Sequence, residues 1–369
     1  MKKTLLALAV PALLAASAAN AATVYEKDGQ KFAVWGRVQT SLLNDAAAAF
    51  DGDTTTSETT LVGLGRLRLE GSTAINNQWK AIAKAEWQVA AENSDNDAKE
   101  VKDASGNVIG TTSKDNGKFQ ARHVYLGFDG AQYGKVIVGQ TDTAYYDAIA
   151  ATDMFNQWGS SANGYLGRQE GQVIYSNTWG GFHGGASYQF ADDTAKAEVG
   201  SKADTNYVNV GKLDYGYAAN LGYNFAQGFG LTAGLSKSKF AKAGTVADVD
   251  KDDWAVSGSY GVAGEAGFYG AAMYNQTKQE SQSNSVKYQG YELIGIYRLE
   301  NNVSFLGGYN FREVTDSDYA SVAKADTTDE YLVGVGYDFT SNFLGWVEYA
   351  ADQIDGNDDR FAATLQYNF

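Results

Sequence analysis

Apolar and polar side chains alternate along most of the chain, and helical periodicity is scarce. In the last nine residues, one face carries Phe361, Ala363, Leu365, Tyr367 and Phe369, and the other carries Ala362, Thr364, Gln366 and Asn368. Successive side chains of a strand point to opposite faces, so one face suits lipid and the other suits water. Residues 331–353 repeat the pattern twice around a tight turn at Thr340-Ser341-Asn342. The pattern therefore predicts antiparallel strands joined by hairpins.

Short turns alternate with long polar connections along the sequence. The short turns fall at Asn76-Asn77, Gly180-Gly181, Gln227-Gly228 and Asn301-Asn302. The long connections are expected at residues 44–59, 92–117, 191–206, 241–251, 279–285, 315–327 and 352–358. This layout is typical of bacterial outer-membrane barrels, which have short periplasmic turns and long outer loops. We predict an all-β fold, a transmembrane antiparallel β-barrel of about 16 strands, with both termini on the periplasmic side.

The alternative is a soluble all-β protein such as a sandwich or a solenoid, whose strands also alternate. Two features favour the barrel. Aromatic residues gather near the expected strand ends, as interfacial girdles do; they include Trp79, Trp87, Trp179, Trp346 and Tyr349. The apolar face is rich in Gly and Ala, and no tail or linker divides the chain.

The first residues have the pattern of an export signal. Lys2 and Lys3 precede an apolar stretch, residues 5–14, and Ala19-Asn20-Ala21 has the small-x-small pattern of a cleavage site. The apolar stretch is too short for a spanning helix, which needs about 20 residues. We expect residues 1–21 to be a cleaved signal peptide and residues 22–369 to be the mature barrel of an outer-membrane protein.

Composition and charge exclude several classes of function. The only proline, Pro11, lies in the expected signal, and there is no Cys for a disulfide, a thiol nucleophile or a Cys-zinc site. The net charge is −15, and removing Lys2 and Lys3 makes it about −17, too acidic for a nucleic-acid binder. The acidic runs 95–97, 248–253 and 355–359 fit solvated loops better than divalent-cation sites, so no metal is assigned.

An enzyme is disfavoured because only two histidines are available as a general base, His123 and His183. Both lie in expected strands. His123 shares the parity of Tyr125 and Gly127 and is opposite to Arg122, so we expect it to point away from the lumen. The sequence shows no phosphate-binding loop or zinc motif, and we expect no catalytic residue and no cofactor.

Charged residues share one face of several expected strands. Arg66, Arg68 and Glu70 alternate with Leu67 and Leu69. Similarly, Lys84, Glu86 and Gln88 alternate with Ala and Trp. Placing Arg or Lys against mid-bilayer lipid costs about 2–4 kcal/mol. The charged face must therefore be the lumen of the barrel.

Three motifs resemble those of the general trimeric porins of Gram-negative bacteria. They are Val24 to Lys31 leading into Val34-Trp35-Gly36-Arg37, then Tyr146-Asp147-Ala148 with Thr152-Asp153-Met154, and finally Gln366-Tyr367-Asn368-Phe369. The likeness covers essentially the whole mature chain. It implies a 16-stranded barrel, a homotrimer, and passive permeation of small hydrophilic solutes and ions.

The resemblance also implies a constriction, made by an inward-folded third loop at about residues 142–166. The family's basic wall maps onto Arg37, Arg66, Arg122 and Arg168, and its first loop acid maps onto Asp153. Where the family usually carries Pro-Glu-Phe-Gly-Gly, residues 156–160 read Asn-Gln-Trp-Gly-Ser, so Gln157 replaces the second acid. Glu170 could supply the lost charge. Further lumen charges are expected at Arg68, Lys84 and Glu86.

The resemblance implies further partners: outer-membrane lipid, lipopolysaccharide, and the barrel-assembly machinery, which would read Phe369. The acidic net charge predicts a weak cation preference. A channel specific for one solute class stays open, since Trp35, Trp158 and Tyr165 could form a short aromatic track. A purely structural barrel is the third alternative.

Overall fold

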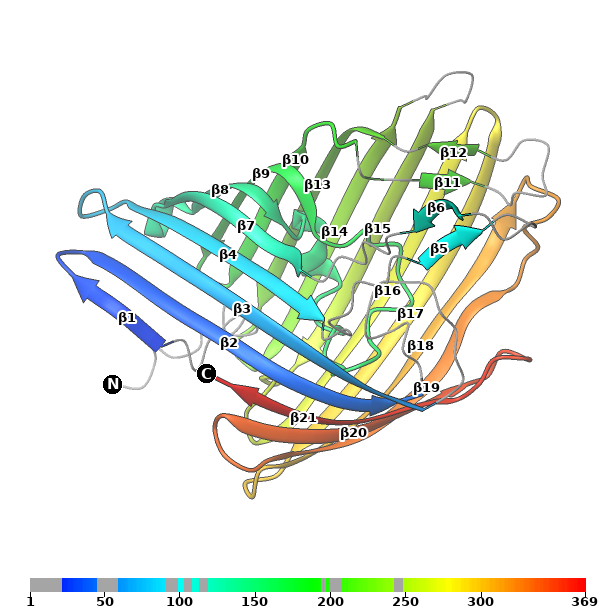
Figure 1. The fold of residues 1–369 in the computed structure, drawn as a ribbon. Helices are drawn as coiled ribbons and strands as arrows, with labels where there is room; N and C mark the ends of the chain where they lie inside the picture. Colours follow the sequence, from blue (N-terminus) through cyan, green and yellow to red (C-terminus); the bar gives the residue numbers. More distant parts are fainter. Residues whose placement is uncertain are drawn as a thin grey trace.

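A computed structural model describes most of the chain from residue 22 onward (Figure 1). The residues described are 22–44, 59–90, 99–102, 108–112, 119–193, 195, 197–199, 208–210, 212–241 and 248–369. The expected signal peptide, residues 1–21, lies outside them, as do most of the long connections at 44–59 and 92–117. No helix among the described residues is long and apolar enough to cross a membrane.

The described secondary structure is almost entirely β. The strands are β1 (Ala22–Lys27), β2 (Gln30–Leu43), β3 (Thr60–Ala74), β4 (Lys80–Ala90), β5 (Lys99–Lys102), β6 (Val108–Thr112), β7 (Phe119–Asp129), β8 (Lys135–Thr141), β9 (Gln169–Trp179), β10 (Phe182–Gln189), β11 (Ala197–Val199), β12 (Val208–Val210), β13 (Leu213–Asn224), β14 (Phe229–Phe240), β15 (Val249–Tyr260), β16 (Gly267–Ser281), β17 (Asn284–Arg298), β18 (Val303–Ser317), β19 (Asp326–Asp338), β20 (Phe343–Asp352) and β21 (Arg360–Asn368). Two 3₁₀ turns are η2 (Ala131–Tyr133) and η3 (Ala144–Ala148).

The main sheet closes into a barrel because its last strand, β21, pairs with β2. Of its 17 strands, β1 and β21 lie end to end along one edge of β2, so sixteen strands form the wall. The neighbouring strands pair antiparallel, and closure of the barrel leaves none of the described wall strands with a free edge. The predicted 16-stranded antiparallel barrel is therefore confirmed.

The two ends of the mature chain meet on β2. Ala22 pairs opposite Val34, and Phe369 exchanges two backbone hydrogen bonds of 2.9 Å with Gly36. Figure 1 shows the start of β1 and the C-terminus at the same end of the barrel, where the connections between strands are short. We call this the short-turn end and the opposite one, where β5, β6, β11 and β12 lie, the long-loop end.

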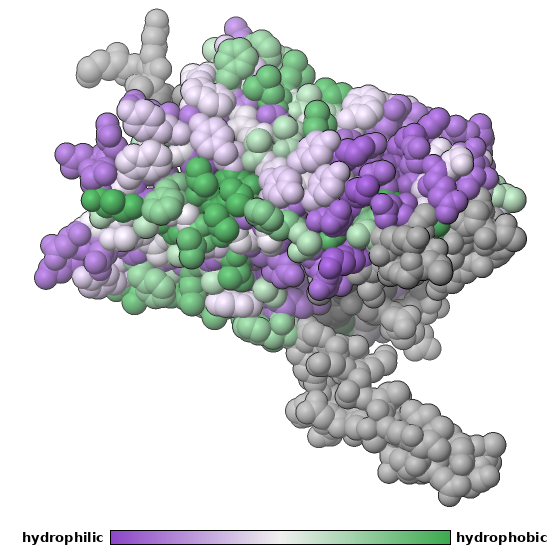
Figure 2. Space-filling view, turned by 90° about the horizontal axis from the view of Figure 1, so that it is seen from above, coloured by the Kyte–Doolittle hydropathy of each residue, from purple (hydrophilic) through white to green (hydrophobic). Residues whose placement is uncertain are grey.

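The predicted alternation of faces is present in the wall. In β2, the side chains of Ala33, Trp35, Gln39 and Ser41 are buried on the inward face, whereas Val38 points outward and is 57% exposed. Large exposed apolar side chains recur on the outward face of every long strand. Figure 2 shows them gathered across the middle of one outer surface, with hydrophilic side chains toward the ends. This surface suits the hydrocarbon core of a bilayer.

Three expected loops are shorter than the sequence indicated. β15 already begins at Val249, β16 and β17 meet in a tight hairpin where Ser281 pairs with Asn284, and β18 runs to Ser317. These strand ends carry polar side chains on their outward face, such as Lys278 and Lys287. Where a strand extends beyond the apolar belt into water, its outward side chains are polar as well as its inward ones. The hydropathy pattern therefore cannot distinguish them from loops.

Candidate functional site

The predicted basic residues meet around one cavity of about 650 Å³ in the barrel interior. Its charged lining is Arg37, Arg66, Arg68, Lys84, Arg122, Lys135 and Arg168 with Glu86, Asp142 and Asp147. Seven cationic side chains thus face three acidic ones. Glu170 is exposed and lines a separate cavity of about 240 Å³ beside Arg168. Asp153 and Gln157 are absent from the lining of both cavities.

Two arginines of this wall face each other across neighbouring strands. Arg37 of β2 pairs directly with Arg66 of β3. Like charges in this position destabilise a sheet by about 0.2–1 kcal/mol. Each guanidinium instead finds a neutral partner: Arg37 Nη1 donates to Gln366 at 3.2 Å, and Arg66 Nη2 donates to Gln88 at 2.6 Å. Neither guanidinium hydrogen-bonds a carboxylate, although Glu86 lies 3.9 Å from Arg66 Nε.

Glu86 of β4 holds several of the arginines in place. Its carboxylate is 1% exposed and accepts hydrogen bonds from Arg68 Nε at 2.6 Å and from Arg122 Nε at 2.8 Å. Arg66 Nε lies 3.9 Å from the same group. A buried carboxylate is stable only when it is paired and hydrogen-bonded, and this one is. Its single charge leaves the arginine wall with a net positive charge.

A β-bulge at Arg122 corrects the prediction for His123. Between β4 and β7 the register shifts: Glu86 pairs with His123 and Trp87 with Ala121, so Arg122 is the extra residue. An extra residue reverses the parity of the residues on one side of the bulge relative to the other. His123 therefore faces the cavity, where Nδ1 lies 2.8 Å from Thr141 Oγ1 and Nε2 accepts from Arg168 Nε at 3.3 Å. The expectation that His123 points away from the lumen was wrong.

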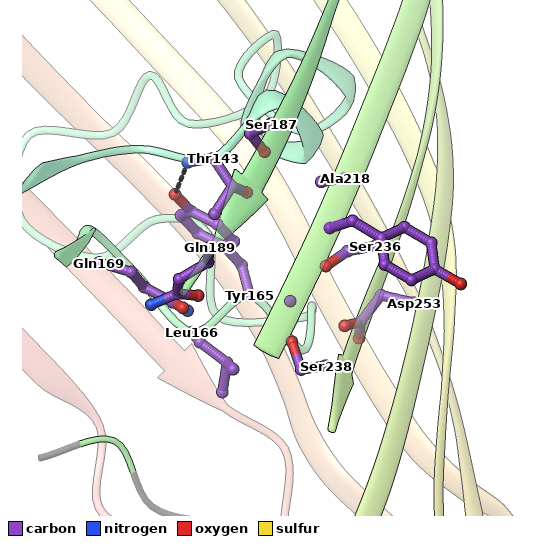
Figure 3. A pocket seen from close by; sticks show the side chains of 12 residues that line it. Thr143, Tyr165, Leu166, Gln169, Ser187, Gln189, Ala218, Ser236, Ser238 and Asp253 are labelled. Carbon is purple, nitrogen blue, oxygen red and sulfur yellow. Dashed lines mark hydrogen bonds between the residues drawn. The ribbon is translucent and has the colours of Figure 1, made fainter. Parts of the chain in front are cut away.

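One tyrosine, Tyr165, joins the two ends of the segment between β8 and β9, residues 142–168. The Tyr165 hydroxyl accepts from the backbone N–H of Thr143 at 3.0 Å and donates to Asp142 at 3.0 Å. Asp142 in turn lies 3.5 Å from Arg168 Nε. Figure 3 shows Thr143 and Tyr165 facing Ser187 and Ser236 of the wall across a small polar pocket. These contacts join the two ends of the segment beside Arg168, and the backbone N–H of Ala144 donates to Ser187 of β10 at 3.1 Å.

Three glutamates on the inward face of the wall hold the middle of this segment, and the sequence did not reveal them. Glu292 of β17 accepts from Thr152 Oγ1 at 2.6 Å, Ala162 N at 3.0 Å and Asn163 Nδ2 at 3.1 Å. Glu348 of β20 accepts from the backbone N–H groups of Asn156 and Gln157, both at 2.8 Å. Glu330 of β19 accepts from Ser161 Oγ at 2.8 Å. In the sequence, Glu292 and Glu348 are single acids between apolar residues, and Glu330 follows Asp329.

Apolar contacts complete the attachment of the segment to the wall. Tyr145, Ala148 and Ile149 pack on Ala218 and Met273. Farther along, Phe155 packs beside Tyr269 and Ile294, and Trp158 packs on Leu332 and Ala350. Trp158 is 4% exposed, so it lies within an apolar cluster and cannot form a permeation track with Trp35 and Tyr165. The segment therefore lies against β13–β20, on the face opposite to the exposed apolar side chains.

The wall has glycines where the segment approaches it most closely. A methyl group at Gly290 of β17 would overlap the carbonyl oxygen of Ala162, and one at Gly308 would overlap the ring of Phe155. These positions therefore require the absence of a side chain.

We expect the substitution Gly290→Ala to push the segment away from the wall and into the pore. Overpacking of this kind costs about 1–3 kcal/mol of folding free energy, and the displaced backbone would lower single-channel conductance. Gly295→Ala on the same strand is the matched control, because its methyl group would meet Phe268 at an ordinary 3.5 Å. Equal conductance of the two variants would contradict the close packing of Gly290 against the carbonyl oxygen of Ala162.

Known proteins resemble the chain in sequence and in fold. Residues 5–369 match the family model described as Gram-negative porin. Outer membrane protein S2 of Salmonella typhi and outer membrane porin N of Escherichia coli (strain K12) are each 27% identical to it, over 97% and 98% of this chain and 94% and 96% of theirs. The solved Salmonella typhi OmpF complex with daunomycin superimposes with a TM-score of 0.71 at 21% identity, covering 94% of this chain and 100% of that one.

Proposed function

Because the chain belongs to the family of Gram-negative porins, it is an outer-membrane diffusion channel, and we propose that solutes cross it through a charged constriction. This assignment confirms the resemblance noted in the sequence. The proposed constriction lies between the arginine wall, Arg37, Arg66, Arg122 and Arg168, and residues 142–166 of the segment. The observation that carries the proposal is the cavity that these arginines share with Asp142 and Asp147 of the segment.

The proposed mechanism is passive sieving by size and charge. Cations on β2, β3 and β7, with Arg168 just before β9, face the carboxylates of Asp142 and Asp147, and this arrangement produces a field across a narrow aqueous gap. Small hydrophilic solutes that can orient in this field keep their hydration and charge pairing, whereas apolar solutes are disfavoured. The charge that lines such a gap biases the sign of the permeating ion. No chemical step is required, in keeping with relatives that are channels.

The excess of positive charge around the cavity bears on ion selectivity. The expectation of a weak cation preference used the net charge of the whole chain, which includes many charges that do not line the cavity. Seven cationic and three acidic side chains line the cavity itself. We therefore propose that the channel prefers anions.

The test of this proposal is the conductance of the refolded protein in a planar bilayer, with the reversal potential measured in a salt gradient. Stable openings whose conductance rises linearly with salt support an aqueous pore, and the sign of the reversal potential reports the preferred ion. A folded barrel that conducts no current would refute the diffusion channel. A conducting barrel with a cation preference would refute only the proposal that the arginine wall sets the ion selectivity.

We expect the anion preference to grow as the pH falls from 7 to 5. Burial, and then the neighbouring charge of Asp142, raise the pKa of Asp147 in η3 to about 6. Asp147 is thus ionised above this pH and neutral below it, and its neutralisation removes one of three negative charges from the cavity. The reversal potential, measured at several pH values, should shift toward anions on acidification. In Asp147→Asn the anion preference should be high at every pH, and a persistent pH dependence in that variant would assign it to another group.

A homotrimer is proposed for the assembled channel. The solved Vibrio cholerae OmpT, described as a trimer form, shares the fold with a TM-score of 0.65. Apart from Phe32 at the start of β2, the large apolar side chains exposed on β2 and β3 are aliphatic (Val38, Leu42, Leu61 and Leu67), whereas β17–β20 expose many Tyr and Phe. An interruption of the aromatic rows fits a surface covered by another subunit. Conductance steps in groups of three would support three pores per assembly, and single steps throughout would oppose it.

Cleavage after Ala21 remains a proposal, supported by the position of Ala22. This residue begins β1, beside the stretch of β2 that binds Phe369. The mass of the exported protein tests it. Phe369 itself is 43% exposed at the end of the barrel, which suits its proposed recognition by the assembly machinery. Contacts with lipid and lipopolysaccharide are likewise proposed for the outward face.

A further inference from the structure

His123 and Arg168 meet at the edge of the arginine wall, although they are 45 positions apart in the sequence. Consecutive side chains of a regular strand point to opposite faces, but the bulge in β7 lets Arg122 and His123 both line the cavity. The imidazole lies between Thr141, the last residue of β8, and Arg168, just before β9. The ring thus contacts the wall where the segment 142–168 leaves it, and also the last residue of the segment.

The two hydrogen bonds of the imidazole define its protonation. The Nε of an arginine is always a donor, so Nε2 of His123, 3.3 Å away, must accept with its lone pair. A protonated ring would place two donors and two positive charges against each other at this contact. The single N–H of the neutral ring is therefore on Nδ1, and it donates to Thr141 Oγ1 at 2.8 Å. Because both nitrogens are used, the ring has no lone pair left to bind a solute or a metal ion.

The other three arginines of the wall each donate to a side-chain oxygen on a neighbouring strand: Arg37 to Gln366, Arg66 to Gln88 and Arg122 to Glu86. Among the described residues, the one hydrogen bond that Arg168 donates is to His123. Arg168 also lies outside β9, which begins at Gln169, so strand pairing does not direct its side chain. His123 therefore does for Arg168 what a glutamine does for two of the other arginines: it is a neutral acceptor, which holds a guanidinium without adding negative charge.

Two carboxylates are alternative partners for the guanidinium of Arg168. Asp142 Oδ2 lies 3.5 Å from its Nε, farther than in an N–H···O hydrogen bond of about 2.7–3.2 Å. Glu170 lines the cavity of about 240 Å³ on the other side of Arg168. Arg168 lines both this cavity and that of the arginine wall, whereas His123 lines only the latter of the two. A full ion pair with Asp142 would cancel the charge of Arg168, and one with Glu170 would withdraw it from the arginine wall.

We propose that His123 is a positioning residue that keeps the charge of Arg168 at the constriction. Its imidazole holds the guanidinium beside the path and prevents full pairing with either carboxylate. His123 then affects the permeating ion only through Arg168. This inference rests on the proposed diffusion channel and adds a determinant of ion selectivity to it.

Three substitutions of His123 separate its two hydrogen bonds. In His123→Gln the amide reaches the position of Nε2 and can accept from Arg168. In His123→Asn the shorter amide reaches only the position of Nδ1 and can donate to Thr141. His123→Leu removes both hydrogen bonds. His183→Leu is the matched control, because it removes the other histidine, which contacts Thr232 and lies outside the lining of the cavity.

The measured quantity is the ratio of chloride to potassium permeability, obtained from the reversal potential in a potassium chloride gradient. Each variant is measured alone, and His123→Leu is also combined with Arg168→Gln. The combination forms a double-mutant cycle, which reports whether one residue acts through the other. A gel shift between heated and unheated samples shows that each barrel is folded.

We expect His123→Leu and His123→Asn to lower the permeability ratio by nearly as much as Arg168→Gln. His123→Gln should restore a ratio close to that of the wild type, and His183→Leu should not change it. In the Arg168→Gln background, His123→Leu should cause no further change, because its effect passes through Arg168.

Three results would overturn the positioning role while leaving the channel intact. The first is a wild-type ratio in folded His123→Leu, and the second is a further fall of the ratio in the double variant. The third is a wild-type ratio in His123→Asn with a lowered one in His123→Gln, since the contact with Thr141 would then be the important one. This last comparison decides if His123→Leu does not fold. A folded wild-type protein that carries no current would overturn the channel, and the positioning role with it.

Discussion

Replacing Glu292 by alanine is expected to turn a steadily open channel into one that flickers and closes at low voltage. Glu292 is completely buried and accepts hydrogen bonds from Thr152, Ala162 and Asn163, which lie at two separate places in the segment 142–168. Without the carboxylate, these donors lose their shared partner, at about 1–3 kcal/mol for each one left buried and unpaired. Part of that cost is avoided if the segment leaves the wall, and it then moves into the pore.

Single-channel recordings at stepped voltages measure this effect as the rate of closure and the voltage at which it begins. Glu300→Ala removes the same charge from an exposed turn at the short-turn end and should behave like the wild type. Glu292→Gln keeps the shape but replaces one acceptor by an amide donor, so it should fall between the two. If Glu292→Ala stays open at the same voltages as Glu300→Ala, the segment is held by its other contacts alone.

Replacing Arg66 by glutamine is expected to shift the reversal potential toward cations while leaving the barrel at least as stable. Arg66 contributes one of seven positive charges at the cavity, and it faces Arg37 directly across two strands. Removing one of two opposed like charges should relieve about 0.2–1 kcal/mol. Arg68 and Arg122, which hold Glu86, are left in place. A residue that reduces stability but shapes the field is expected at a functional site.

Two measurements together check this prediction: the reversal potential in a salt gradient, and the denaturant concentration at which the barrel unfolds. Lys31→Gln is the control, because Lys31 is exposed at the short-turn end and lies outside the cavity lining. It removes the same charge from the chain. Equal shifts of the reversal potential in both variants would mean that overall charge, and not the arginine wall, sets the selectivity.

The sequence by itself determined the barrel and the inward direction of its arginines. Alternation over eight or more residues assigns every side chain of a strand to one of two faces, and lipid tolerates charge on neither Arg37 nor Arg66. This local rule predicted which side chains of β2, β3 and the C-terminal strand share a face, as well as the short turns. The motifs that resemble porins then identified the segment that faces the arginines.

Only the tertiary structure decided how the interior is filled. The bulge at Arg122 turned His123 toward the lumen, because one inserted residue reverses parity without any change in composition. Glu292, Glu330 and Glu348 look like any inward acids until the segment 142–168 is seen to donate to them. Val249 and Val286 likewise become informative only when β11 and β12 cover them. The contacts of these glutamates and valines join residues that are far apart in the chain. Periodicity reports only which face of a strand a side chain occupies, so it cannot predict such contacts.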